Sequence, residues 1–191
     1  MTKSIVLLFF ILLPVTVNAE LYFEFGIEEG GDTLISSEGQ YYYGGSHDYE
    51  KDLNVGGGLK IAVGIHNMLC ENNDRSLSVA IGYLQDDIDA SNGDAEYDTV
   101  TFDAIYGFHF DSHRLGVGAS YHIGPEFKAD VDGFPSVRAE FDDALGLIIQ
   151  YSYAFKPSLH LGLRLTEMDY EVNDVTLDAG SIGIFFAYIP Q

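Results

Sequence analysis

The fold of this 191-residue chain is decided by stretches such as residues 100–110, VTFDAIYGFHF. Every even-numbered residue of this stretch is apolar, whereas the odd-numbered residues include a Thr, an Asp, a Gly and a His. A period of two is that of a β-strand, which places its apolar side chains on one face and its small or polar side chains on the other. Residues 100–110 are therefore predicted to form a strand between two unlike environments.

The same alternation recurs in seven further segments, so the sequence predicts eight strands. The other segments are residues 21–27, 55–65, 77–83, 115–121, 145–153, 159–165 and 182–188. Short links (67–75, 111–112 and 156–158) alternate with long ones (28–54, 85–98 and 124–136), and the link after the seventh segment, 172–176, is shorter. An even number of antiparallel strands with short turns on one side and long loops on the other is the plan of an outer-membrane barrel. We expect an all-β protein, an eight-stranded antiparallel transmembrane up-and-down β-barrel.

The composition excludes several classes of function. The chain has 30 Asp and Glu against 9 Lys and Arg, a formal net charge of −21, which excludes general binding to the phosphate backbone of a nucleic acid. A single cysteine, Cys70, excludes an intrachain disulfide and a multi-cysteine zinc site. Hydrophobic residues make up 47% of the chain, which argues against disorder.

The N-terminal residues have the pattern of a secretory signal peptide. Lys3 precedes nine apolar residues, 5–13, and Ala19 ends a short segment of the kind that a signal peptidase cleaves. The alternative, a retained membrane anchor, is disfavoured because a spanning helix needs about 20 apolar residues. We expect residues 1–19 to be a cleaved signal peptide and residues 20–191 to be the barrel domain.

The residues between the apolar positions favour a membrane barrel over a soluble one. They are mostly Gly, Ala and Ser, for example Gly64, Ala80 and Gly118. Small residues suit the crowded lumen of a narrow barrel, whereas the exterior of a soluble barrel or sandwich needs bulky polar groups. The apolar face is thus expected to contact lipid.

Aromatic residues of outward parity are predicted to form a girdle at each membrane interface. The rim on the short-turn side is expected to contain Phe108, Phe110, Tyr151, Tyr153, Phe186 and Tyr188, and the opposite rim Tyr83, Phe102, Tyr121 and Phe141.

With its signal peptide, its eight alternating segments and a last segment that reads GSIGIFFAY over residues 180–188, the chain resembles the small outer-membrane β-barrel proteins of Gram-negative bacteria, the OmpA/OmpW/OmpX-like superfamily. The resemblance implies export to the outer membrane, contact with outer-membrane lipid and lipopolysaccharide, and insertion by the barrel-assembly machinery. That machinery reads a C-terminal aromatic residue in this superfamily. Tyr188 has that place here, although three further residues follow it.

Four ionisable residues have inward parity and are predicted to close the lumen as an ion-pair network. They are Glu24, Lys60, Asp103 and Arg164. Counting residues along the strands makes Glu24 and Lys60 neighbours and lets Arg164 reach Asp103 or Glu24, and a charge in a narrow lumen must be paired. The alternative is a small gated pore or a ligand contact.

No catalytic residue, metal site or cofactor is predicted. Ser120 and His122 share one face, with Glu140 and Asp142 nearby, which is enough on paper for a nucleophile and a base. Their face is the lumen, however, whereas acyl chains arrive from the lipid, and no oxyanion hole is recognisable. A lipid-modifying barrel, or one that transports a small hydrophobic molecule, is the alternative to a non-enzymatic surface protein.

The long links are acidic and suggest contacts outside the cell. Asp87, Asp89 and Asp98 match three positions of a calcium loop, but Gly93 is displaced from the position that the turn requires, so only loose association of Ca²⁺ or Mg²⁺ is left open. A run of three exposed tyrosines would make good contact residues for an extracellular ligand or surface. These candidates are Tyr41, Tyr42 and Tyr43.

Overall fold

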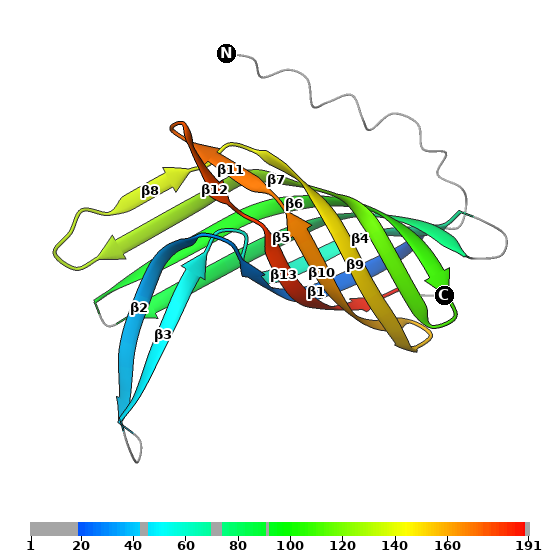
Figure 1. The fold of residues 1–191 in the computed structure, drawn as a ribbon, viewed down its shortest axis with the longest axis horizontal. Helices are drawn as coiled ribbons and strands as arrows, with labels where there is room; N and C mark the ends of the chain where they lie inside the picture. The colour runs from blue at the N-terminus through cyan, green and yellow to red at the C-terminus, as the bar shows by residue number, and fades with distance from the viewer. Residues whose placement is uncertain (1–18, 43–45, 70–73, 91, 190–191) are drawn as a thin grey trace.

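In the computed structural model, eight strands form a closed antiparallel barrel (Figure 1). The structure describes residues 19–42, 46–69, 74–90 and 92–189, and for residues 37–42, 46–51 and 90 it describes the backbone alone. Among the described residues no helix is long and apolar enough to cross a membrane. The barrel strands are β1 (Glu20–Gly30), β4 (Gly58–Met68), β5 (Arg75–Ala90), β6 (Gly93–Phe110), β7 (His113–Val131), β9 (Ala144–Lys156), β10 (Leu159–Glu167) and β13 (Ser181–Tyr188).

The order around the barrel is β6-β5-β4-β1-β13-β10-β9-β7, and pairing of β6 with β7 closes the ring. The first and last strands, β1 and β13, are neighbours. Closure leaves no strand edge unpaired toward lipid, which is the condition for a β-structure to span a membrane. The predicted eight-stranded antiparallel barrel is confirmed.

Seven of the eight predicted segments lie wholly within barrel strands, and the segment 55–65 does not. Its first residues, 55–57, form a turn before β4, in which Val55 is fully buried and Gly56 has a φ of 75°. A Cβ at Gly56 would overlap the backbone of Ala179. The alternation in residues 55–57 thus reflects an inward-packed turn and not a strand.

Each barrel strand exposes apolar side chains on its outer face. Examples are Ile27, Ile61, Ile81, Phe108, Val117, Ile149, Leu163 and Ile184, one on each of the eight strands. The residues between them point inward, and those on β4 and β5 include the buried Ala62 and Ala80. An apolar surface that surrounds the whole barrel is far larger than the patches of soluble monomers, and it fits a lipid environment.

The six aromatic residues predicted for the short-turn rim are all exposed on the outer face: Phe108, Phe110, Tyr151, Tyr153, Phe186 and Tyr188. On the opposite rim Tyr83 is exposed, whereas Phe102 and Tyr121 are half-buried.

Phe141 was wrongly predicted to belong to the outer girdle. It is buried inside the barrel, with its ring centroid 5.6 Å from that of Tyr170. Phe141 precedes β9, and its N–H donates to the carbonyl of Pro125. The alternation of inward and outward side chains holds only within a strand, so it does not predict the direction of Phe141.

The long links contain further β-structure. β2 (Thr33–Tyr42) and β3 (Ser46–Asn54) pair as a hairpin, β8 (Val137–Glu140) pairs with β7, and β11 (Asp169–Val172) pairs with β12 (Val175–Asp178). Figure 1 shows β5, β6 and β7 running past the barrel toward the same end of the molecule as the β2–β3 hairpin. Much of this region was predicted to be loop, whereas β5, β6 and β7 continue beyond the membrane-facing part of the barrel.

The continuation of β5 and β6 explains the acidic segment that resembles a calcium loop. Asp87 is aligned with Glu96, and Asp89 with Asp94, across the β5–β6 ladder. An extended, paired backbone cannot wrap around a cation as a calcium-binding loop does. Carboxylates replace aliphatic side chains on the outer face of these strands beyond Tyr83 and Val100, which marks where the lipid-facing surface ends.

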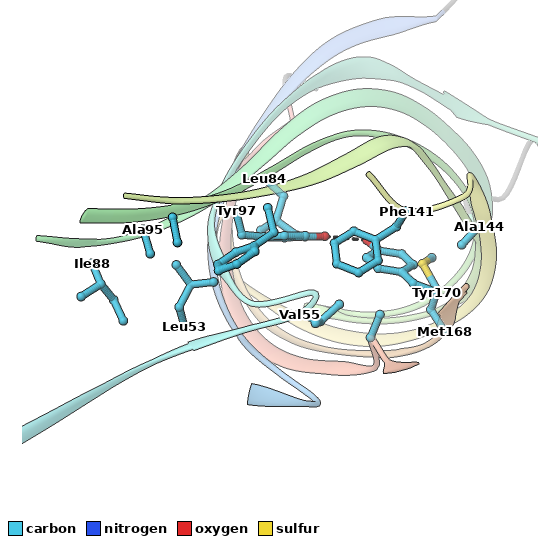
Figure 2. Packing of buried hydrophobic residues seen from close by; sticks show 13 residues of the cluster. Leu53, Val55, Leu84, Ile88, Ala95, Tyr97, Phe141, Ala144, Met168 and Tyr170 are labelled. Atoms are coloured by element: carbon cyan, nitrogen blue, oxygen red, sulfur yellow. Dashed lines mark hydrogen bonds between the residues drawn. The ribbon is translucent and has the colours of Figure 1, made fainter. Parts of the chain in front are cut away.

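At this end of the barrel an apolar cluster extends from inside the ring of strands to the strands beyond it (Figure 2). Its buried members are Leu53, Val55, Leu84, Ile88, Ala95, Tyr97, Phe127, Ala129, Phe141, Ala144, Met168, Tyr170 and Ala179. They come from barrel strands and from the segments between them. The side chains of Tyr97, Phe141 and Tyr170 lie inside the ring of strands, so the barrel is filled with side chains on the long-loop side.

The outer face is tested by placing a charge on it. Leu163→Arg should destabilise the barrel by about 2–4 kcal/mol, because the guanidinium would lie near the middle of the bilayer. Urea unfolding of the barrel refolded in lipid vesicles measures this change. Val175→Arg, on an exposed residue of the β11–β12 hairpin, is the matched control and should be close to neutral. Equal effects of the two variants would contradict a lipid-facing Leu163.

Candidate functional site in the barrel lumen

The four ionisable residues predicted to face the lumen are all buried there. Glu24 on β1, Lys60 on β4, Asp103 on β6 and Arg164 on β10 are each no more than 5% exposed. They occupy alternate positions whose neighbours along the chain face lipid. Since neither lipid nor bulk water is available to these charges, they must satisfy one another.

The structure brings the four residues, together with Glu28, into one network. Lys60 Nζ lies 2.8 Å from Asp103 Oδ2 and 3.9 Å from Glu28 Oε1. Arg164 binds Glu24 with both terminal nitrogens, with distances of 2.7 Å from Nη1 to Oε1 and 2.8 Å from Nη2 to Oε2. Its Nη1 is also 3.5 Å from Asp103 and 3.8 Å from Glu28. Two cations therefore hold three carboxylates across the lumen.

The expected contact between Glu24 and Lys60 is not the one that forms. In the β1–β4 register Lys60 is aligned with Gly26, and Glu24 with Ala62, so the two charges are two residues apart in height. Lys60 instead reaches across the lumen to β6. Counting residues from the strand ends placed Glu24 and Lys60 at the same height, because the count contains no information on the stagger between β1 and β4. Arg164, expected to reach Asp103 or Glu24, reaches both.

Neutral groups complete the network. Ser120 Oγ donates to Asp103 at 2.6 Å, and Ser181 Oγ donates to Glu28 at 2.8 Å. Arg164 also donates to Gln150 Oε1 at 2.9 Å and lies 5.1 Å above the ring of Phe185. Sequence analysis missed Glu28, Gln150 and Ser181. Continuing the alternation of β1 one step past Ile27 would have included Glu28, whereas nothing in the sequence marks Gln150 or Ser181.

The residues considered for catalysis are engaged elsewhere. The Ser120 hydroxyl donates to Asp103, and His122 Nδ1 lies 2.5 Å from the Tyr170 hydroxyl. Glu140 is exposed and pairs with Arg138, and Asp142 is exposed on the surface. Ser120 therefore donates to an ion-paired carboxylate and His122 contacts a tyrosine, so these contacts do not pair the serine with the histidine as a nucleophile and its base.

A hydrogen-bonded chain of three side chains joins His122 to two tyrosines of the apolar cluster. The hydroxyls of Tyr97 and Tyr170 are 2.6 Å apart (Figure 2). Tyr170 also contacts His122. Burial raises the pKa of both tyrosines above its ordinary value, and their mutual contact adds to the rise at Tyr97. Both hydroxyls therefore stay protonated at neutral pH and can serve as neutral donors.

Two of the three tyrosines predicted as contact residues, Tyr41 and Tyr42, are the last residues of β2. Tyr43 lies outside the described residues, and for Tyr41 and Tyr42 the structure describes the backbone.

Comparison with known proteins supports the fold. No family model matches the chain, and no curated protein matches it. Among solved structures, the chain is similar to Neisserial surface protein A, with a TM-score of 0.53, 18% identity, and coverage of 90% of this chain and 98% of that one. The fold is that of a small outer-membrane β-barrel. The prediction of a Gram-negative outer-membrane barrel is thus confirmed at the level of the fold.

Two further outer-membrane barrels are more distant. The attachment invasion locus protein Ail of Yersinia pestis, in a complex with the heparin analogue sucrose octasulfate, has a TM-score of 0.48 and 11% identity, over 89% of this chain and 97% of that chain. The N-terminal β-barrel domain of Pseudomonas aeruginosa OprF has a TM-score of 0.39 and 12% identity, over 90% and 100% of the two chains.

The pair of Lys60 and Asp103 can be tested with a double-mutant cycle. Lys60→Met should destabilise the small barrel by about 3–5 kcal/mol, because Asp103 would lose its closest cation in a buried place. Adding Asp103→Asn should restore part of that loss, as measured by urea unfolding in lipid vesicles. Lys60→Met combined with Glu24→Gln is the control, since no direct contact joins that pair. Additive effects for Lys60 and Asp103 would contradict the pairing.

Proposed function

We propose that the chain is a non-enzymatic integral protein of the Gram-negative outer membrane, whose lumen is closed and which acts through the surface it presents outside the cell. The observation that carries this proposal is the filled lumen. Charged side chains cross it within the membrane, and the apolar cluster fills it on the long-loop side. Such a barrel offers no continuous aqueous path, so its role has to lie in the parts outside the lipid.

The lumen gives little support to transport of a small hydrophobic molecule. The apolar residues inside the barrel pack against one another, and Tyr97 and Tyr170 are fully buried. The space beside inward glycines is also filled by neighbouring groups. A Cβ at Gly162 would overlap the Phe185 ring and the carbonyl oxygen of Tyr151. A transport site would need these side chains to separate.

The outer surface of the extended strands favours cationic partners. Carboxylates of outward parity follow one another along β5 and β6, among them Asp87, Asp89 and Glu96. Outer-leaflet lipopolysaccharide is itself anionic and would need a divalent cation between its phosphates and these side chains. A ligand or surface with exposed amino groups needs no such bridge, and long-range attraction would guide it to the barrel.

The proposal includes a route to the membrane. Removal of residues 1–19 by a signal peptidase would leave a chain that begins at β1, and the barrel-assembly machinery would then insert the eight strands. The exposed Tyr188 near the end of β13 supplies an aromatic residue of the kind that this machinery reads.

The closed lumen is tested by conductance. The refolded protein should give no stepwise channel openings in planar bilayers, and vesicles that contain it should release no fatty acid in a parallel lipid-hydrolysis assay. Regular openings of the unmodified protein would contradict the closed lumen. Hydrolysis that disappears in Ser120→Ala would instead support the enzymatic alternative.

The outer surface is tested on intact cells with fluorescent poly-lysine as the cationic probe. The triple variant Asp87→Asn/Asp89→Asn/Glu96→Gln should bind less probe than the unmodified protein, with the difference shrinking as salt is added, because exposed charges are screened. Asp111→Asn, in the short turn on the other side of the membrane, is the control and should bind as the unmodified protein does. Equal binding by all three proteins would contradict a role for this surface.

A further inference from the structure

The net charge of the buried lumen residues is zero only when Arg114 is included with the ion-pair network. Among the described residues, three carboxylates and three cations are buried: Glu24, Glu28, Asp103, Lys60, Arg114 and Arg164. Lys60 and Arg164 contact all three carboxylates, so that five-membered network carries a net charge of −1. Arg114 supplies the missing positive charge, yet it forms no direct ion pair within the described part of the chain.

Arg114 is buried on the short-turn side of this network. It is 5% exposed, and its guanidinium lies against Gly107 of β6, where a Cβ would overlap the Nε atom. Its Nη2 donates to Ser78 Oγ at 2.8 Å, and that oxygen lies 2.9 Å from His66 Nδ1. The Nε–H of Arg114 has no partner among the described residues. A buried guanidinium with a free donor is costly unless something accepts that hydrogen.

A small cavity lies beside Arg114. Its volume is about 10 Å³, and Arg114, Glu24, His160 and Ser152 are among the residues that line it. His160 is 8% exposed, and its Nδ1 is also without a partner in the described part of the chain. The volume is that of about one water molecule, and a buried water needs two to four polar partners. The cavity has both the size and the partners for one water.

We propose that this cavity binds a single water molecule, which accepts the Nε–H of Arg114 and donates to the Glu24 carboxylate and to His160. The water makes Arg114 the third cation of the lumen network. The inference rests on the closed lumen proposed above and deepens it, because Arg114 then brings the buried charge to zero. Without Arg114 the lumen would hold three carboxylates against two cations.

A water fits this cavity better than a small anion does. Glu24 lines the same cavity, so chloride would lie beside a carboxylate. Chloride would also leave the six buried charges with a surplus of one negative charge. A water has no charge to desolvate, and it can accept from Arg114 while it donates to Glu24.

The water is tested directly by NMR on the full refolded protein, unmodified, in lipid nanodiscs. A cross-peak between water and the Nε–H of Arg114 is expected, and it should be unaffected when chloride is replaced by gluconate. Absence of the cross-peak would overturn the water site. A cross-peak or a thermal midpoint that depends on chloride would also overturn it, in favour of the anion.

The energetic coupling between Arg114 and Glu24 is tested with the variants Arg114→Met and Glu24→Gln. The urea midpoint of the double variant should lie above the value obtained by adding the two single losses, because each single variant leaves the other charge without its water-mediated partner. Arg114→Met with Asp103→Asn is the matched control, since Asp103 is buried and charged but does not line the cavity. Equal coupling in the two pairs would mean that overall charge, and not the shared water, joins Arg114 to the network.

Single-channel recordings separate this inference from the proposed function. Arg114→Met should give a leak that favours cations, as shown by the reversal potential in a salt gradient, while the unmodified protein stays closed. An anion-selective leak of the variant would contradict the charge balance. Openings of the unmodified protein would instead contradict the closed lumen, and the NMR result would still decide the water site.

Discussion

One constraint governs this structure: the barrel wall is a single layer of residues with lipid on one side and a narrow interior on the other. Every second side chain must therefore be apolar, and each side chain between must find its partner inside. The lumen is too narrow for bulk water, so Lys60 and Arg164 have to meet carboxylates from strands far apart in the sequence. The fold and the charged network are thus two results of one geometry.

The alternation within each strand was sufficient to predict the fold, because lipid imposes the same rule on every segment. The pattern also placed Glu24, Lys60, Asp103 and Arg164 on the inner face, and the structure shows all four there. Which of these charges meet could not be predicted. The partner of Lys60 depends on the stagger between β1 and β4 and on the width of the lumen, and neither is encoded in the residues of one strand.

Predictions were least accurate where lipid no longer imposes the rule. Phe141 and Val55 continue an apolar pattern, but each lies outside a strand, where backbone contacts and packing set the direction of the side chain. Strands in the long links were also harder to predict. Along them, inward apolar residues such as Ile88 and Tyr97 alternate with outward carboxylates. There the period of two reflects a protein interior and an aqueous exterior, so strands continue without any membrane to span.

The pairing of β1 with β13 has a consequence for how the molecule must be made. The residues of β13, 181–188, are synthesised long after their partners in β1, residues 23–30. Contacts so distant in sequence form slowly. Until they form, two strand edges offer their amides and carbonyls to any neighbouring chain. A factor that shields or templates those two edges until β13 pairs with β1 would therefore favour closure of the barrel over association with another chain.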